Sequence, residues 1–248
     1  MLLKELENYT GQLLEVERFR DYCPNGVQVE GRNEIKRLVS GVSASLDFLK
    51  AAVAAGADAL LVHHGWFWKN EDARITGIKR VRLEWLLRHD VSLLAYHLPL
   101  DAHPQLGNNA QLAGKLGARI DGWFGEQVLA AHGELSAPLE LSAWARQTGE
   151  ALGRTPLVIG EPGREIRRVA WCSGGAQGHF EEAVRLGVDA FLTGEISEQN
   201  THVARETGVA FVAAGHHATE RYGVQALGAH LAERFGIEHR FIDIANPV

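Results

Sequence analysis

The chain has 248 residues, of which 46% are hydrophobic and 23% are charged, so one large domain or two small ones can bury a sizeable core. Its formal net charge of −6 disfavours nonspecific binding to nucleic-acid phosphates. Short basic runs such as residues 79–82 could still form a local basic patch. It has only two cysteines, Cys23 and Cys172, which argues against a disulfide framework and against thiolate-bound zinc.

Helices and strands are expected to alternate along the first half of the chain. Residues 3–14 place leucines on one helical face, and residues 45–55 read as a helix between the N-cap Ser45 and the C-terminal stop Gly56. The elements expected in this half are helices at 3–14, 45–55, 81–88 and 108–116, and strands at 37–42, 58–62 and 91–95.

The second half shows the same alternation. Its last helix is expected to be interrupted or bent near Gly228. Pro24–Gly26 and Gly174-Gly175 read as turns, and neither matches a phosphate-binding loop or a dinucleotide fingerprint. The elements expected here are helices at 142–152, 180–186, 198–207 and 220–235, and strands at 168–172, 188–192, 209–213 and 241–244.

Segments of the two halves look like copies of each other. Residues 55–61 align with 186–192, and 97–101 align with 216–220 at a similar offset. This register predicts the internal duplication of one α/β unit. No linker rich in proline, glycine or serine separates the halves, so we expect an α/β protein of two similar lobes, 1–122 and 123–248, with a metal site in the cleft between them.

Histidine and carboxylate residues follow three of the expected strands. His63-His64 closes one apolar run, and in each aligned segment a carboxylate comes four residues after a histidine: Asp101 after His97, and Glu220 after His216. Open α/β sheets bind ligands beyond the carboxyl ends of their strands. Imidazole and carboxylate groups gathered there predict a site for a divalent cation.

Several of these residues also have purely structural interpretations. Successive side chains of a regular strand point to opposite faces, so one of His63 and His64 could lie in the core and the other in solvent. Pro99 disfavours a helix at the preceding residue, which predicts that the segment turns from a strand into a loop. Asp101 could cap the turn that follows.

In the second aligned segment, Thr219 is a plausible N-cap that would place Glu220 in the first turn of a helix. His217 could support a ligand or replace His216 as one. Glu195 follows the equivalent strand, and it could act as a general base, orient a ligand, or open the next helix as a first-turn acid.

Two tryptophans, Trp66 and Trp68, follow the first histidine pair. Either could stack on a planar ring or simply cover the core.

Taken together, these motifs resemble the NIF-three-like dinuclear metal-centre family, often described as GTP cyclohydrolase 1 type 2 homologues. The matching segments span nearly the whole chain, and the length is similar to that of the short members. They are residues 24–29, 62–65, 97–101, 108–109, 193–195 and 215–220.

The resemblance implies two metal ions between two similar lobes. His64 and Asp101 would hold one ion, His63 and His216 the other, and Glu220 would bridge them. The resemblance also implies a ring-shaped homohexamer whose metal sites face an internal cavity.

His97 and Glu195 are the candidate catalytic residues, since both are expected near the proposed ligands. Two cations held about 3.5–4 Å apart by a carboxylate can activate water, so the predicted function is a metal-dependent hydrolase acting on a nucleotide-like substrate. The absence of cysteine ligands suits two ions of iron, manganese, cobalt, nickel or zinc.

The alternative is a non-catalytic metal-binding ring protein with a regulatory or DNA-repair-related partner. The acidic N-terminus does not read as a signal peptide, and no apolar run is long enough to span a membrane, so we expect a cytoplasmic protein.

Overall fold

A computed structural model describes all 248 residues, and the chain divides into two compact units. The first unit comprises Met1–Leu100 and Gly223–Ala245, and the second comprises Asp101–Tyr222 and Asn246–Val248. Each unit contains one sheet with helices on both of its faces, which confirms the α/β class. The expected boundary between residues 122 and 123 falls inside the second unit, within one of its strands.

The first unit is built on a five-stranded sheet in the order β1-β4-β3-β2-β11, in which only β1 runs antiparallel to its neighbour. The C-terminal strand β11 pairs with β2, which explains why segments from both ends of the chain share this unit. The strands are β1 (Gly26–Val29), β2 (Arg37–Ser43), β3 (Ala59–His64), β4 (Ser92–Ala95) and β11 (Glu238–Phe241). The helices are α1 (Leu3–Leu13), η1 (Val16–Arg18), α2 (Leu46–Ala54), α3 (Gly77–His89), α4 (Leu98–Ala102) and α10 (Arg221–Phe235), of which α4 and α10 continue into the second unit.

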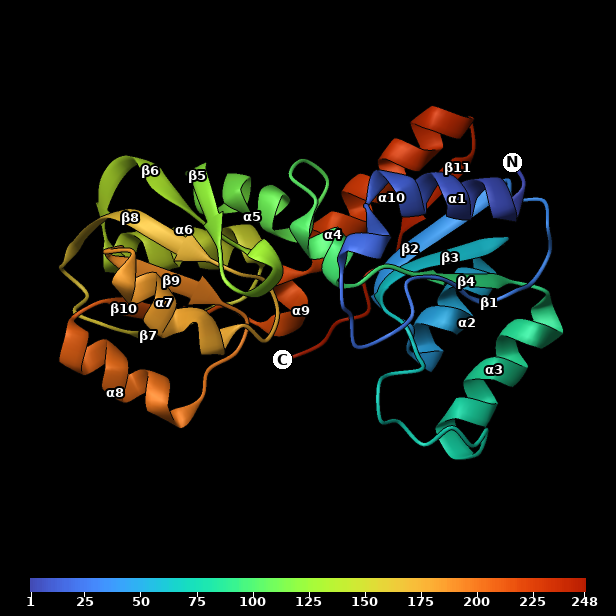
Figure 1. Cartoon of the computed structure of the whole chain (residues 1–248), viewed down its shortest axis with the longest axis horizontal. Coiled ribbons are helices and arrows are strands. Elements are labelled where there is room, and N and C mark those ends of the chain that lie inside the picture. Colours follow the sequence, from blue (N-terminus) through green and yellow to red (C-terminus); the bar gives the residue numbers. More distant parts are fainter. The chain divides into compact units, whose positions relative to one another are not determined.

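The central strands β2, β3 and β4 are buried along most of their length because helices cover both faces. Figure 1 shows α2 and α3 on one side and α1 and α10 on the other. On the α2 side, Leu60 and Val62 of β3 share a core cluster with Phe48 and Leu49. Strand β3 is therefore rigid up to the histidines at its end.

The second unit has a six-stranded sheet in the order β5-β6-β8-β9-β10-β7, with a parallel centre formed by β8, β9 and β10. Its strands are β5 (Ala118–Phe124), β6 (Ala130–Glu140), β7 (Leu157–Ile159), β8 (Glu165–Trp171), β9 (Ala190–Thr193) and β10 (Ala210–Ala213). Its helices are α5 (Asn108–Leu116), η2 (Glu126–Val128), α6 (Leu141–Leu152), η3 (Gln177–His179), α7 (Phe180–Arg185), α8 (Glu198–Thr207) and α9 (His216–Thr219).

The core of the second unit also has two layers. Leu192 and Val212 pack with α5 and α6 on one face of the sheet. On the other face, Phe180 of α7 stacks on Phe191 and meets Phe211 edge-on, with ring centroids 5.8 and 4.9 Å away. The loops that follow β8, β9 and β10 thus extend from a packed sheet.

The two units share a local hydrogen-bonding pattern. Asp58 Oδ2 accepts from the backbone N–H groups of Lys36 and Arg37, each at 2.9 Å. Asp189 Oδ2 accepts in the same way from residues 167 and 168, at 2.9 and 2.8 Å. The alignment of 55–61 with 186–192 pairs these two aspartates. Descent of both units from one duplicated segment stays a prediction.

The structure differs from the expected elements in four places. Helix α10 runs through Gly228 without an interruption, and this glycine is needed because a Cβ there would lie 2.1 Å from Nε2 of the His239 ring. The last strand is β11, which ends at Phe241 instead of starting there. Helix α3 begins at Gly77, earlier than expected. The strands β1, β5, β6 and β7 were not expected, since none of them contains four consecutive apolar residues.

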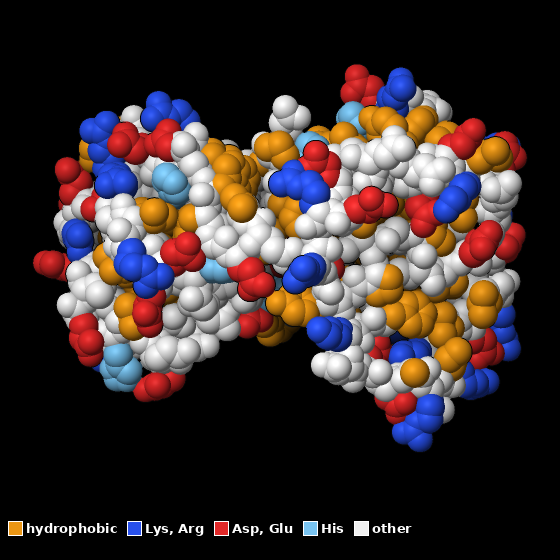
Figure 2. All heavy atoms as spheres, viewed as in Figure 1, with side chains coloured by type: hydrophobic (Ala, Val, Ile, Leu, Met, Phe, Trp, Pro, Cys, Tyr) orange, Lys and Arg blue, Asp and Glu red, His pale blue; other side chains and the backbone are white.

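On the face shown in Figure 2, lysine and arginine side chains are interspersed with aspartate and glutamate on both units. This mixed surface agrees with the net charge of −6. No helix combines the length and the apolar character that crossing a bilayer would require.

Candidate metal centre

Three histidines gather at one edge of the first unit's sheet. His63 and His64 end β3, and His97 follows the neighbouring parallel strand β4, so all three lie at the carboxyl ends of strands. The centroid of the His63 ring lies 4.6 Å from that of His64 and 5.0 Å from that of His97. Strand alternation therefore does not separate the first two imidazoles. A ligand nitrogen from each of the three rings lies within 4.8 Å of the others.

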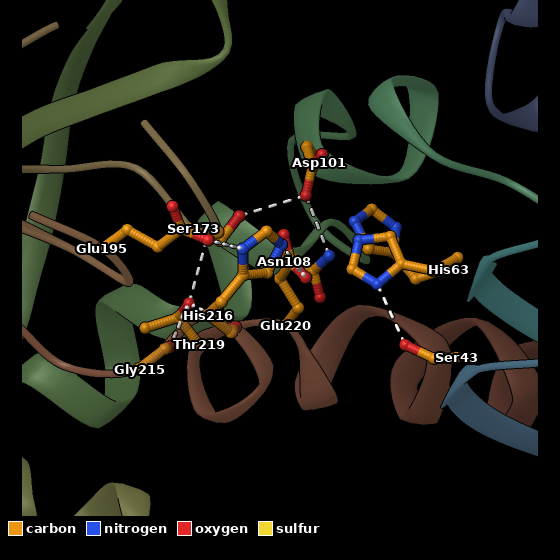
Figure 3. A network of polar contacts seen from close by, with 12 residues as sticks. Ser43, His63, Asp101, Asn108, Ser173, Glu195, Gly215, His216, Thr219 and Glu220 are labelled. Carbon is orange, nitrogen blue, oxygen red and sulfur yellow. Dashed lines mark hydrogen bonds and ion pairs between the residues drawn. The ribbon is translucent and has the colours of Figure 1, made fainter. Parts of the chain in front are cut away.

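A second contact fixes each ring of the histidine pair. The Nδ1 atom of His63 is 3.0 Å from the carbonyl oxygen of Tyr96, and a carbonyl can only accept, so this nitrogen carries the hydrogen and Nε2 carries the lone pair. Nδ1 of His64 is 3.1 Å from Oγ of Ser43, which Figure 3 shows beside the pair. Metal-binding histidines are typically oriented in this way through their second nitrogen.

His97 is held by a residue that sequence analysis missed. Its Nδ1 lies 2.7 Å from Oδ1 of Asp21, whose side chain is only 4% exposed. The two residues are 76 positions apart, and Asp21 lies in a loop without a recognisable motif, so no local signal could identify it.

The two tryptophans after β3 have different roles. Trp66 is buried, and its Nε1 donates to the carbonyl oxygen of Ala44 at 3.0 Å, so it belongs to the core. Its backbone is held by Gln28, whose amide oxygen accepts from the Trp66 N–H at 2.7 Å. Trp68 is half-buried and meets the ring of His97 edge-on, 5.1 Å between centroids.

In the second unit, Asp101 is buried and receives two hydrogen bonds at one oxygen. Nδ2 of Asn108 and Oγ of Ser173 donate to its Oδ1 at 2.9 and 3.0 Å (Figure 3). Asp101 lies in α4, and the cap of the next helix is Gly107, so the capping interpretation is wrong. The expected loop is also wrong: Pro99 lies in the first turn of α4, where a missing N–H has no consequence.

His216 lies between two carboxylates of the same unit. Its Nδ1 is 2.7 Å from Oε1 of Glu195, and its Nε2 is 3.2 Å from Oε2 of Glu220. Burial lowers the pKa of His216, but its hydrogen bonds and charge interactions with Glu220 and then Glu195 outweigh this and raise the pKa to about 9. Glu195 does not open a helix, because the first-turn acid of α8 is Glu198.

Glu220 is 3% exposed and packs over the backbone at the end of β8. Gly174 has a φ of +66°, and a Cβ there would lie 2.1 Å from Oε1 of Glu220. Thr219 is not an N-cap: it ends α9, accepts from the Gly174 N–H at 3.0 Å and donates to the Gly215 carbonyl at 2.9 Å. An oxygen of Glu220 and one of Asp101 lie within 4.8 Å of each other.

The remaining residues of interest support this arrangement. The backbone N–H of His217 donates to the carbonyl oxygen of Val248 at 3.0 Å. Asn109 is buried, and its Oδ1 accepts from the Ser173 N–H at 2.8 Å, which fixes the loop after β8. Burial, followed by the charges of Asp101 and Glu220, raises the pKa of the Cys172 thiol, so this cysteine does not supply a thiolate.

Each unit therefore offers a set of donors that suits a divalent cation. The first unit provides three oriented imidazoles, and the second provides one imidazole and two buried carboxylates. A mixture of imidazole nitrogen and carboxylate oxygen without thiolate fits iron, manganese, cobalt, nickel or zinc better than calcium or magnesium.

The family model for Duf34/NIF3 (NGG1p interacting factor 3) matches residues 1–247. A protein of Pseudomonas aeruginosa named GTP cyclohydrolase 1 type 2 homolog is 54% identical over 249 residues, which cover 99% of this chain and 97% of that protein. The solved structure of protein ybgI, titled as of unknown function, is 49% identical with a TM-score of 0.96, and both chains are covered completely. Protein TTHA1606 of Thermus thermophilus is 33% identical with a TM-score of 0.91, again with both chains covered completely.

Proposed function

The chain belongs to the Duf34/NIF3 family, and from this premise we propose that it holds two divalent metal ions and hydrolyses a nucleotide-like substrate. The observation that carries the proposal is the orientation of the histidines in the first unit. Two of them have Nδ1 bonded to an oxygen that can only accept, which leaves Nε2 as the ligating or proton-accepting atom.

In this proposal His64 and Asp101 would hold one ion, and His63 and His216 would hold the other. Glu220 would be shared by the two ions, a role that suits a buried carboxylate with two oxygens. Glu195 orients His216 through Nδ1, as Tyr96 does for His63.

The bound ions would polarise the substrate and make a nucleophile available near neutral pH. His97 is the proposed proton acceptor, because the bond from Nδ1 to Asp21 leaves the lone pair on Nε2, and a ring nitrogen of His97 lies within 4.8 Å of one on each of His63 and His64. The name carried by relatives such as the P. aeruginosa protein supports a purine nucleotide as the first substrate to test. Either a phosphoester or a purine ring carbon could be the point of attack.

The metal assignment is tested by elemental analysis of purified protein after chelation and reloading with each candidate metal. Wild-type protein is expected to retain about two ions per chain. Glu220→Ala should remove the bridge and empty both positions, whereas Asp101→Ala should weaken one position more than the other. His202→Ala is a matched control, since His202 forms an exposed pair with Glu198 at 2.7 Å on the same unit. Equal metal retention in the first two variants would overturn the assignment.

The hydrolase proposal is tested separately, with metal-loaded protein and a panel of GTP, other nucleotides and simple phosphoesters. Turnover that disappears in His216→Ala supports it. Retention of two ions without turnover of any substrate would contradict it and favour the alternative of a non-catalytic metal-binding protein that acts through a partner. The homohexamer remains part of the proposal, and light scattering should give about six times the chain mass of 27.2 kDa.

A further inference from the structure

Asp21 is a buried carboxylate that no expected motif includes. It lies in the loop between η1 and β1, and its side chain is 4% exposed. Its Oδ1 accepts from His97 Nδ1 at 2.7 Å and from the Tyr22 N–H at 2.6 Å. Its Oδ2 accepts from Asn25 Nδ2 and from the Leu98 N–H, both at 2.9 Å. Burial raises the pKa of Asp21, but the interaction with His97 and the hydrogen bonds from Asn25 and Tyr22 lower it by more. The net pKa therefore lies below its ordinary value, and the group is an anion.

The same contacts fix His97 at both its ring and its backbone. The backbone N–H of His97 donates to Oδ1 of Asn25 at 2.8 Å, while Nδ2 of Asn25 donates to Asp21. The carboxylate can only accept, so Nδ1 of His97 carries a hydrogen and Nε2 of the neutral ring carries the lone pair. The ring centroid lies 5.0 Å from that of His63, and a ring nitrogen of His97 lies within 4.8 Å of one on each of His63 and His64.

We propose that Asp21 is the positioning residue that presents His97 Nε2 as the proton acceptor of the reaction. The inference deepens the proposed hydrolysis and rests on it. As water attacks the substrate, one O–H bond of the water breaks, its electron pair stays on the oxygen, and the proton moves to Nε2. Asp21 then stabilises the imidazolium, which returns the proton to the leaving oxygen as its bond to the substrate breaks.

The neighbouring thiol does not compete for this role. Cys23 is buried beside the pair, and its sulfur lies within 4.8 Å of the ligand atoms of Asp21 and His97. Burial, followed by the charge of Asp21, raises the pKa of Cys23 to about 12, so it remains a protonated thiol. Asp21 is therefore the group that sets the hydrogen position on His97.

The test is Asp21→Asn, which keeps the size of the side chain and can turn its NH2 group toward His97 Nδ1. This would move the ring hydrogen to Nε2 and remove the acceptor. We expect kcat to fall by about 10²- to 10⁴-fold with little change in KM. Metal content should stay at the wild-type level, because the proposed ligands of this unit are His63 and His64, and Tyr96 and Ser43, not Asp21, orient their rings.

The decisive measurement is the tautomer of His97, because a loss of stability alone would not change it. In metal-free protein at alkaline pH, long-range ¹H–¹⁵N spectra should show hydrogen on Nδ1 of His97 in wild type and on Nε2 in Asp21→Asn. The signals of the His97 ring are identified by their absence from the spectrum of His97→Gln. His89 serves as an internal reference, since its Nδ1 must donate to the Trp85 carbonyl at 2.7 Å.

Asp58→Asn is the matched control for lost stability. Asp58 also accepts backbone hydrogen bonds in this unit, but it lies at the start of β3, at the opposite end from the histidines. The Asp58→Asn substitution should lower Tm without changing the His97 tautomer or kcat. An unchanged tautomer in Asp21→Asn would overturn the inference. If wild-type protein hydrolyses nothing, the proposed function fails, and the tautomer still decides whether Asp21 positions His97.

Discussion

At the scale of single residues, His216 shows how the second unit combines charge and burial. Its ring lies between Glu195 and Glu220, at 2.7 and 3.2 Å. These carboxylates raise its pKa to about 9 against the opposing effect of burial. In the absence of metal the proton on His216 offsets the charge of two neighbouring carboxylates, and a bound cation would take over this role.

This arrangement predicts how the stability of the metal-free protein depends on pH. The folded-state pKa of about 9 lies above the unfolded value of 6.5, so the protonated form contributes stability that is fully present below about pH 6.5. That contribution, on the order of 3 kcal/mol, is lost as pH rises through about 9. Urea unfolding in the presence of a chelator, at about pH 6, 7.5 and 9, measures the change.

His216→Gln should flatten this pH dependence, whereas His202→Gln, at the exposed pair with Glu198, should leave it in place. Because metal binding must displace the proton from His216, metal affinity is expected to change in the opposite direction and to increase up to about pH 9. A stability profile that is the same in His216→Gln as in wild type would contradict this account.

At the scale of elements, the loops after parallel strands bring the polar groups together because glycines allow close approach. In the loop after β8, Gly174 lies against the side chain of Glu220. In the loop after β9, Gly194 lies against the backbone of His216, and a Cβ on Gly194 would lie 2.5 Å from the Cα of His216. These two glycines let α9 pack against the strand ends.

Gly174→Ala is therefore expected to reduce metal binding. An alanine at φ +66° is strained, and its Cβ would contact the buried carboxylate of Glu220, so we expect a loss of about 1–3 kcal/mol in unfolding free energy and weaker metal retention. Denaturant unfolding and elemental analysis measure both effects. Gly178→Ala is the control in the same connection, since a Cβ there meets nothing within 4 Å. Similar metal content in both variants would show that Gly174 does not support Glu220.

At the scale of the whole molecule, the two units are not successive halves of the chain. Residues 101–222 form most of the second unit, and residues 223–245 return to the first, where β11 extends the parallel sheet beside β2. The last three residues belong to the second unit again, where the carbonyl of Val248 accepts from the His217 N–H. The chain thus passes from one unit to the other three times.

This organisation predicts which fragments fold. A fragment of residues 101–222 contains all six strands of the second sheet, whereas one of residues 123–248 lacks α5 and nearly all of β5 and carries α10 and β11 without the sheet they pack on. We expect cooperative thermal unfolding by circular dichroism for the first fragment and aggregation or no transition for the second. Cooperative folding of 123–248 instead would support the sequence-based boundary.

Much of this architecture could be predicted from the sequence, because apolar runs of strand length and glycine stops are local signals. They placed β2, β3, β4, β9 and β10 and put histidines or carboxylates at several strand ends. Local signals failed where a distant contact decides the structure. Gly228 lies within α10 where the ring of His239 approaches too closely for a Cβ, and the edge strands depend on their neighbours for pairing.

The same division holds for the candidate site. The sequence by itself determined the residue types and their places along the chain: paired histidines, and carboxylates four residues after a histidine. Only the tertiary structure decided that Asp21 holds His97, that Glu195 holds His216, and that Trp66 is core while Trp68 lies beside a histidine. The physical reason is that a hydrogen bond to a ring nitrogen requires two side chains within about 3 Å, and for residues remote in sequence only the packed fold sets that distance.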